Sequence, residues 1–192
     1  MSKRPDRHRP PDAPGMVHVY TGDGKGKTTC AVGLATRAAG AGLRVWMLQF
    51  DKNFEDAERC NERAALEKLG VTLIATGCNR LLDNGRFRFK NLDSDLEEAR
   101  RGLTLAREVI EKQAHDLIIL DEAIASVATG LLREGDITDL IALHRAHPRA
   151  ELVLTGRGAW PGLMESADLV TEMKMHRHYF EQGVTLRPGI DH

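Results

Sequence analysis

The stretch that most constrains the fold of this chain runs from Gly22 to Thr29, with the sequence GDGKGKTT. It follows a short apolar segment, 16–20, and precedes a stretch rich in small residues, 30–40. A strand, a glycine-rich loop and Gly-Lys-Thr at the start of a helix form the arrangement that binds phosphate groups in P-loop proteins. Glycine permits this because it has no Cβ to keep the backbone N–H groups away from an anion. The sequence therefore predicts a nucleotide-binding P-loop.

The first glycine of this loop is displaced from the usual pattern G-x-x-x-x-G-K-[ST]. Counting back from Gly26 places Thr21 at the first position, and the glycine follows it as Gly22. We therefore expect a phosphate-binding loop whose first turn is altered and in which the nucleotide lies unusually. Lys27 is expected to place its charge on the phosphates, and Thr28 is expected to offer its hydroxyl to Mg²⁺.

A second segment of the chain, Leu117–Glu122, has four apolar residues followed by two carboxylates. In P-loop proteins a buried strand of this kind delivers a carboxylate to the metal ion beside the loop. We therefore expect Asp121 and Glu122 to act with Thr28 as ligands of Mg²⁺ or Mn²⁺. In a conventional ATPase or kinase, Glu122 would instead orient the attacking group. The chain has no Asn-Lys-x-Asp element that reads guanine, so ATP is the expected nucleotide.

Further apolar segments alternate with stretches of helical periodicity along the rest of the chain. The pattern Ser94-x-x-Glu97 predicts a capping box at the start of a helix that ends near Gln113. Alternating strands and helices predict an α/β fold with a mostly parallel, doubly wound sheet, of the P-loop NTPase (RecA-like) class. The remaining predicted strands are 45–50, 71–76, 151–155 and 169–173, and the remaining predicted helices are 58–69, 123–129, 136–146 and one that begins at Pro161.

Length and composition indicate one globular domain. The chain has 192 residues and a net charge of −1, so no nucleic-acid or membrane partner is expected. Residues 1–15 are basic and proline-rich and are predicted to form a flexible arm, and residues 16–192 a single domain. The longest apolar runs are too short to span a bilayer. Three cysteines without a C-x-x-C pair fit a reduced environment, so a cytoplasmic location is expected.

Three segments carry hypotheses that the sequence leaves open. Residues 77–91 hold no clear element, and the alternating Arg and Phe residues at 86–90 could form an edge strand or the basic wall of a pocket. Arg157, between two glycines after the predicted strand 151–155, is expected to contact a phosphate or another ligand. His176 and His178 have no third ligand at a suitable spacing, which argues against a metal site there.

From residue 16 to the C-terminus the chain resembles the ATP:corrinoid adenosyltransferases, also called cob(I)yrinic acid a,c-diamide adenosyltransferases. The P-loop with Thr-Gly in place of the leading glycine is a trait of that family. The matching residues are VYTGDGKGKTT at 19–29, QF at 49–50, ATG at 75–77, LDE at 120–122, LTGR at 154–157, ADLVTEMK at 167–174, His178, Phe180, QG at 182–183 and GID at 189–191.

This resemblance implies transfer of the 5′-deoxyadenosyl group of MgATP to a Co(I) corrinoid, with release of triphosphate, in adenosylcobalamin biosynthesis or salvage. In the family, ATP lies reversed in the P-loop so that its 5′ carbon faces the corrinoid. The resemblance assigns catalysis to Lys27, Thr28 and Glu122. It assigns nucleotide binding to Gly22, Asp23, Gly24, Lys25, Gly26, Lys27, Thr28, Thr29, Arg37 and Arg157.

The resemblance also implies partners and moving parts. A flavin-type reductase would supply the reduced corrinoid, the protein would be a homodimer, and the N-terminal segment and the loop after residues 75–77 would close over the site. One stretch departs from a well-known family pattern, in which Phe-Thr-Trp follows Ala-Thr-Gly and crowds the lower ligand of cobalt. This chain has Cys78, Asn79 and Arg80 there, and Phe87 and Phe89 are candidates to replace the aromatic residues.

Two other hypotheses remain beside the adenosyltransferase. The first is a conventional P-loop ATPase or kinase that uses the same fold. The second is a non-catalytic protein that binds ATP or a corrinoid.

Overall fold

The structure of the protein is a computed structural model that describes residues 13–53, 60–81, 86 and 88–191. Its strands form one six-stranded sheet in the order β3-β2-β4-β5-β1-β6, and every neighbouring pair is parallel. The strands are β1 (Val17–Thr21), β2 (Val45–Gln49), β3 (Thr72–Ala75), β4 (Leu117–Asp121), β5 (Glu151–Thr155) and β6 (Leu169–Glu172). The predicted parallel α/β fold is confirmed.

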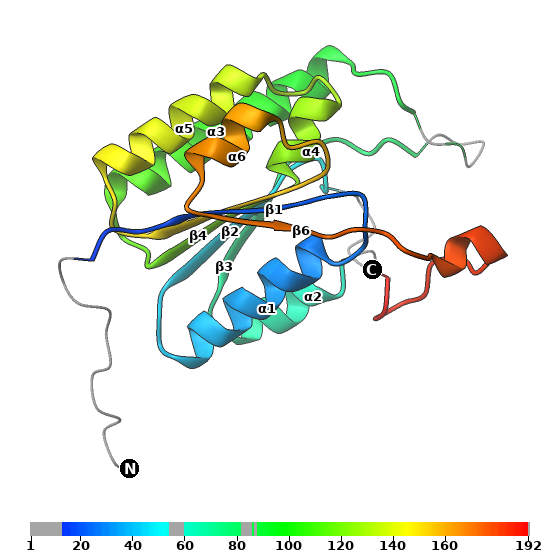
Figure 1. Cartoon of the computed structure of the whole chain (residues 1–192), viewed down its shortest axis with the longest axis horizontal. Helices are drawn as coiled ribbons and strands as arrows, with labels where there is room; N and C mark the ends of the chain where they lie inside the picture. The colour runs from blue at the N-terminus through cyan, green and yellow to red at the C-terminus, as the bar shows by residue number, and fades with distance from the viewer. Residues whose placement is uncertain (1–12, 54–59, 82–85, 87, 192) are drawn as a thin grey trace, which may run out of the picture.

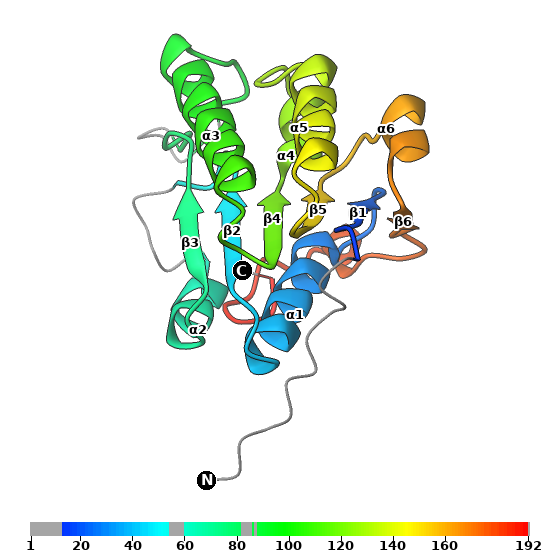
Figure 2. The same cartoon turned by 90° about the vertical axis from the view of Figure 1, so that its left-hand side faces the viewer.

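Helices cover both faces of this sheet, so the domain has three layers (Figures 1 and 2). One face carries α1 (Lys27–Gly40) and α2 (Glu62–Lys68). The other face carries α3 (Asp93–Lys112), α4 (Ala123–Ala128), α5 (Glu134–Ala146) and α6 (Pro161–Ser166). A short 3₁₀ helix, η2 (Tyr179–Gln182), follows β6.

The strand β2 shows why the apolar runs of this sequence are continuous. Val45 and Met47 pack in the core cluster beside α1, and Trp46, Leu48 and Phe50 pack in the cluster on the opposite face. A strand covered by helices on both faces buries every residue, so its sequence does not alternate between apolar and polar. On the α1 side, Ala31, Ala35 and Ala38 are buried toward the sheet, where small side chains allow close packing.

Several predicted boundaries differ from the structure by a few residues. The helix predicted over 58–69 begins at Glu62 in the structure. Residues 58–59, the first two of the predicted helix, lie outside the described part of the chain. Of the predicted arm 1–15, residues 1–12 likewise lie outside it, whereas Gly15 is buried and donates its N–H to the Pro148 carbonyl at 2.7 Å. Within the described residues, none of the helices has the length and apolar character that crossing a membrane requires.

The start of α3 corrects a second prediction. The helix begins at Asp93, and the Asp95 carboxylate, not the Ser94–Glu97 pair, accepts the free N–H of Leu92 at 2.7 Å. The buried Asp95 also accepts two hydrogen bonds from Arg88, at 2.6 and 3.0 Å. The described residues of the segment 86–90 form no strand of the sheet. The hydrogen bonds from Arg88 to Asp95 attach this segment to the start of α3.

We expect Asp95→Asn to lower the free energy of unfolding by about 3 kcal/mol at neutral pH, because it leaves Arg88 without a buried ionic partner. The hydrogen bonds from Arg88 lower the pKa of Asp95 from 3.8 to about 2. A carboxylate whose pKa is lower in the folded protein stabilises it above the unfolded pKa, and that stabilisation is lost as the pH falls through the folded pKa. The difference between wild type and variant should therefore shrink between pH 3.8 and about 2.

Urea unfolding over this pH range measures the effect. Asp93→Asn, an exposed carboxylate in the same first turn, is the matched control and should change stability little. A stability difference for Asp95→Asn that does not depend on pH would contradict the assignment.

Candidate nucleotide-binding site

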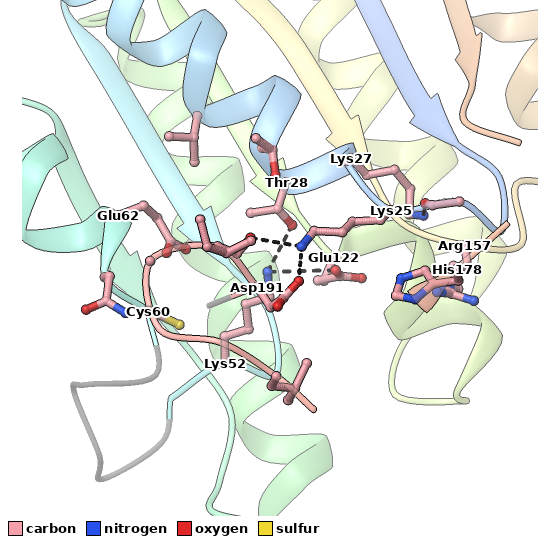
Figure 3. Close-up of a pocket in the computed structure, with 18 residues that line it drawn as sticks. Lys25, Lys27, Thr28, Lys52, Cys60, Glu62, Glu122, Arg157, His178 and Asp191 are labelled. Atoms are coloured by element: carbon pink, nitrogen blue, oxygen red, sulfur yellow. Dashed lines mark hydrogen bonds and ion pairs between the residues drawn. The ribbon is translucent and has the colours of Figure 1, made fainter. Parts of the chain in front are cut away.

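A pocket of about 670 Å³ lies where the carboxyl ends of the strands meet the P-loop (Figure 3). This edge is the usual ligand site of a parallel α/β sheet. The residues that line the pocket come from five parts of the chain: Gly24–Thr29 with Val32; Lys52 and Cys60–Glu62; Glu122; Arg157; and His178, Leu186 and Gly189–Asp191.

The P-loop holds its lysine inside its own turn. Gly22 and Gly26 have φ values of 99° and 119°, in the left-handed region that glycine adopts without strain. The buried Lys27 donates its ammonium to the carbonyl oxygens of Gly22 and Gly24, both at 2.7 Å. Burial, with repulsion from Arg157, lowers the pKa of Lys27. The Lys27 ammonium lies beside the N-terminus of α1, where the helix dipole also favours an anion.

The displaced glycine of the P-loop has a cause within the fold. The segment after β6 runs beside the loop: Met173 donates its N–H to Thr21 O at 2.8 Å, and Gly24 donates its N–H to Met173 O at 2.6 Å. A Cβ at Gly22 or Gly24 would lie 2.5 or 2.6 Å from Met173 O. Asp23 accepts the N–H of Met175 at 3.0 Å, which lowers the pKa of this carboxyl. The two glycines therefore permit the close approach of the β6 extension.

Asp121, the last residue of β4, is the fully buried centre of the site. Its Oδ1 accepts the hydroxyl of Thr155 at 2.6 Å and the hydroxyl of Thr28 at 3.0 Å. Its Oδ2 accepts the ammonium of Lys52 at 2.7 Å, and Gln49 Nε2 lies 3.5 Å away. The ends of β2, β4 and β5 and the start of α1 thus meet at one carboxylate.

Glu122 follows in a left-handed backbone conformation, with φ of 59°, which is unusual for a residue with a side chain. Its N–H donates to Thr155 Oγ1 at 2.9 Å, so one threonine hydroxyl orients both acidic residues. Burial raises the pKa of Glu122, and the positive charge of Lys52, 3.7 Å away, opposes this shift. The Glu122 side chain lines the pocket.

The donor set suits magnesium. Thr28, Asp121 and Glu122 offer only hard oxygen atoms, and Mg²⁺ commonly binds through one or two carboxylates together with substrate phosphates. In the described part of the chain, no group of three or more His, Cys, Asp or Glu side chains could hold a metal ion by itself. A metal here would therefore share its coordination with a nucleotide.

The Thr155-Gly156-Arg157 sequence has a separate function for each residue. Thr155 orients the acidic pair, and Arg157 reaches the pocket. Gly156, with φ of 143°, lies against α4. A Cβ at this position would be only 2.3 Å from the Ala125 N atom, so the close approach requires glycine. The expectation that Arg157 contacts a ligand stays a prediction, and its position at the pocket supports it.

Not all residues predicted for nucleotide binding line the pocket. Gly24, Lys25, Gly26, Thr29, Arg157 and the catalytic candidates do so, whereas Gly22 and Asp23 do not. Arg37 is exposed in the last turn of α1, about 15 Å along the helix from Lys27. It does not line the pocket, and its predicted role is untested.

The sequence did not assign two features of this site. The first is the contact that Lys52 makes with Asp121: its place just after the predicted strand 45–50 indicated only that residues 51–53 lie at the ligand-binding edge of the sheet. The second is the C-terminal segment around Lys25, whose ammonium donates to Tyr179 OH at 2.9 Å, to Ile190 O at 2.8 Å and to Asp191. Arg187 Nε donates to Asp191 at 3.1 Å, and the hydrogen bond from Lys25 is the main cause of the low pKa of Asp191. Resemblance named the Gly-Ile-Asp sequence but gave no role for it.

After Ala75-Thr76-Gly77, Arg80 packs inside the protein and does not line the pocket. Arg80 is buried and donates to Asp51 Oδ1 at 3.0 Å and to Asn91 Oδ1 at 3.1 Å. Gly77, with φ of 118°, packs against Asp51, since a Cβ would lie 2.7 Å from the Asp51 Cα. Arg80 therefore supports the turn after β2. Phe87 lies outside the described residues, and Phe89 is 87% exposed.

The fold and the loop together define an α/β protein of the P-loop class. A KaiC-like protein from Pyrococcus horikoshii shares this fold, with a TM-score of 0.57 and 16% identity, over 86% of this chain and 75% of that one.

The family model of the ATP:corrinoid adenosyltransferases BtuR/CobO/CobP matches residues 13–192, and the chain belongs to this family of transferases. A corrinoid adenosyltransferase of Escherichia coli is 34% identical over 183 residues, covering 94% of this chain and 87% of that protein. The corrinoid adenosyltransferase CobA of Salmonella typhimurium is 32% identical, covering 93% of this chain and 86% of that protein. One from Pseudomonas aeruginosa is 29% identical, with coverage of 94% and 85%.

We expect Lys25→Met to release the C-terminal segment from the P-loop, because the variant loses the ammonium that contacts Tyr179, Ile190 and Asp191. The segment should then open more often, so backbone amides at 181–183 should exchange faster, by roughly tenfold. Hydrogen exchange measured by mass spectrometry tests this. Lys112→Met, which removes an exposed lysine paired with Glu108 on α3, is the control. Unchanged exchange at 181–183 would show that Lys25 does not hold the segment.

Proposed function

We propose that this protein transfers the 5′-deoxyadenosyl group of MgATP to a Co(I) corrinoid and releases triphosphate, in the biosynthesis or salvage of adenosylcobalamin. The observation that carries the proposal is a P-loop pocket, in a member of this family, that is lined by Lys25, Lys27 and Arg157. Positive charge in this pocket suits triphosphate, the most highly charged product of the reaction.

The chemistry explains why such a pocket suffices. Cobalt attacks the 5′ carbon, the cobalt–carbon bond forms, and the bond from that carbon to the ester oxygen breaks with its electron pair on triphosphate. The nucleophile is the metal of the substrate, so no protein base is needed. What remains for the protein is to place positive charge where negative charge develops. Glycine-loop N–H groups, Lys27 and Arg157 are suited to this.

Thr28, Asp121 and Glu122 would hold the magnesium ion, which would neutralise part of the triphosphate charge when bound. The chain's own contribution is orientation, because Thr155 fixes Asp121 through its hydroxyl and Glu122 through its N–H. In this proposal the raised pKa of Glu122 reflects burial beside a cation-binding centre and not the needs of a general base.

The remaining proposals rest on family likeness. A flavin-type reductase would supply the Co(I) state, the protein would act in the cytoplasm, and a homodimer would form. For the dimer, the structure offers one supporting feature: β6 is the outer strand of the sheet, and its four residues are exposed.

We expect Lys27→Ala to lower the rate of adenosyl transfer at least about a hundredfold, because it removes a preorganised charge from the leaving group. The full chain is incubated without oxygen with MgATP and a chemically reduced corrinoid, and the products are separated. Light-sensitive alkyl-cobalt and tripolyphosphate are the expected products of the wild type. Lys112→Ala, far along α3, should keep the wild-type rate.

The products also separate the alternatives. ADP with phosphate would identify a conventional ATPase or kinase, and binding without products would identify a non-catalytic protein. A Lys27→Ala variant that retains a near-normal rate would remove the P-loop lysine from the mechanism.

A further inference from the structure

The side chain of Lys52 occupies the centre of the predicted metal site. Its ammonium lies 2.7 Å from Asp121 Oδ2, 3.1 Å from Thr28 Oγ1 and 3.7 Å from Glu122 Oε1. These are the three residues whose oxygen atoms were predicted to bind magnesium. Figure 3 shows Lys52 extending toward Thr28 and Glu122 from the opposite side of the pocket. One cation of the chain therefore contacts the whole donor set.

The backbone around Lys52 is built to hold it there. Its N–H donates to Thr76 O at 2.9 Å, and its carbonyl accepts Arg63 Nη2 at 2.5 Å. The preceding residue, Asp51, has φ of 52°, and Arg80 binds its carboxylate. A left-handed residue other than glycine persists only where the surrounding contacts enforce it, and such residues concentrate at functional sites.

Asp121 needs this cation. The carboxylate is fully buried, and its other partners in the described structure are two hydroxyls and an amide. A buried carboxylate is stable only when it is paired with positive charge or coordinates a metal. Lys52, whose side chain is only 20% exposed, supplies that charge.

A divalent ion would need the same oxygen atoms. Magnesium binds oxygen at about 2.0–2.1 Å, whereas the ammonium nitrogen already lies within 3.1 Å of Thr28 Oγ1 and Asp121 Oδ2. Two cations that close together in a buried site repel strongly. The ammonium must therefore move away before a metal can bind Thr28 and Asp121 directly. Polyphosphate favours this exchange because it gives the metal further ligands and the ammonium another anion.

We propose that Lys52 is a tethered cation that a divalent metal must displace from Thr28 and Asp121, so that metal binding stays weak until a polyphosphate enters the pocket. Lys52 is then a positioning residue that orders binding. This inference rests on the proposed magnesium site. The inference adds to the assignment of Thr28 and Asp121 as metal ligands, because it identifies Lys52 as the cation that competes with the metal for them.

The test measures Mn²⁺ binding to the full chain without nucleotide, by electron paramagnetic resonance of free Mn²⁺. Lys52→Met keeps the length of the side chain and removes its charge, and it should bind Mn²⁺ at least about tenfold more tightly than wild type. Lys52→Arg retains the charge and should bind weakly. Lys112→Met is the matched control, because it also replaces a lysine by methionine but lies on α3, paired with Glu108 and away from the pocket. Unchanged affinity in Lys52→Met, or an equal gain in Lys112→Met, would overturn the proposal.

Thermal unfolding gives a second readout. In EDTA, Lys52→Met should melt below wild type because Asp121 loses its counter-charge, and Mn²⁺ should raise its Tm by several degrees while leaving the wild-type Tm nearly constant. A variant that folds only with Mn²⁺ supports the proposal. Should Lys52→Met fail to fold with the metal as well, Lys52→Gln, which keeps a hydrogen-bond donor, takes its place in both measurements.

The outcome is separable from that of the proposed function. Tighter Mn²⁺ binding by the uncharged variant supports the role of Lys52 even if no adenosyl transfer is found. Normal transfer by wild type, together with equal Mn²⁺ affinities, would overturn this inference alone.

Discussion

A single buried carboxylate, Asp121, determines how the functional edge of this protein is arranged. Burying an ionised group costs free energy unless hydrogen bonds and an opposite charge compensate it. Here the compensation comes from Thr28 on α1, Thr155 on β5 and Lys52 in the loop after β2. Each of these partners performs a second task, since Thr28 belongs to the P-loop helix, Thr155 also fixes Glu122, and Lys52 reaches the predicted metal ligands. The contacts that stabilise the buried charge of Asp121 are therefore the same contacts that fix the geometry of the site.

The P-loop illustrates how a neighbouring element changes a motif. The glycine that appears displaced in the sequence faces the backbone of Met173, which allows no side chain at Gly22 or Gly24. The same segment continues to the C-terminal residues that bind Lys25, so the loop is supported by chain on the side of β6. The altered spacing thus has a sufficient structural cause in the packing of β6. It does not require that the nucleotide impose it.

Local signals predicted the parts of the fold that depend on local chemistry. The continuous apolar runs around Met47 and Ile119 predicted strands, and both runs lie in the sheet. The strand–loop–helix pattern around Lys27 predicted a phosphate site, and the position of Lys27 at the pocket supports this prediction. What failed or was missed depends on distant partners. Asp95 caps α3 in place of the predicted Ser94–Glu97 pair, and it also binds Arg88, a contact that no local pattern indicates. Lys52, three residues after β2, likewise carries no sequence pattern that points to Asp121. Arg80 looked like a replaced aromatic residue, whereas burial beside Asp51 gives it a structural role.

The three lysines of the pocket differ in what an entering polyphosphate would have to displace. Among the described residues, Lys27 donates hydrogen bonds to the neutral carbonyls of its own loop, whereas Lys25 and Lys52 are each paired with a carboxylate, Asp191 and Asp121. Exchanging a neutral partner for an anion gains more electrostatic energy than exchanging one anion for another. Lys27 is therefore the lysine best placed to bind phosphate first. The two paired lysines connect the pocket to the C-terminal segment, through Asp191, and to the predicted metal ligands, through Asp121.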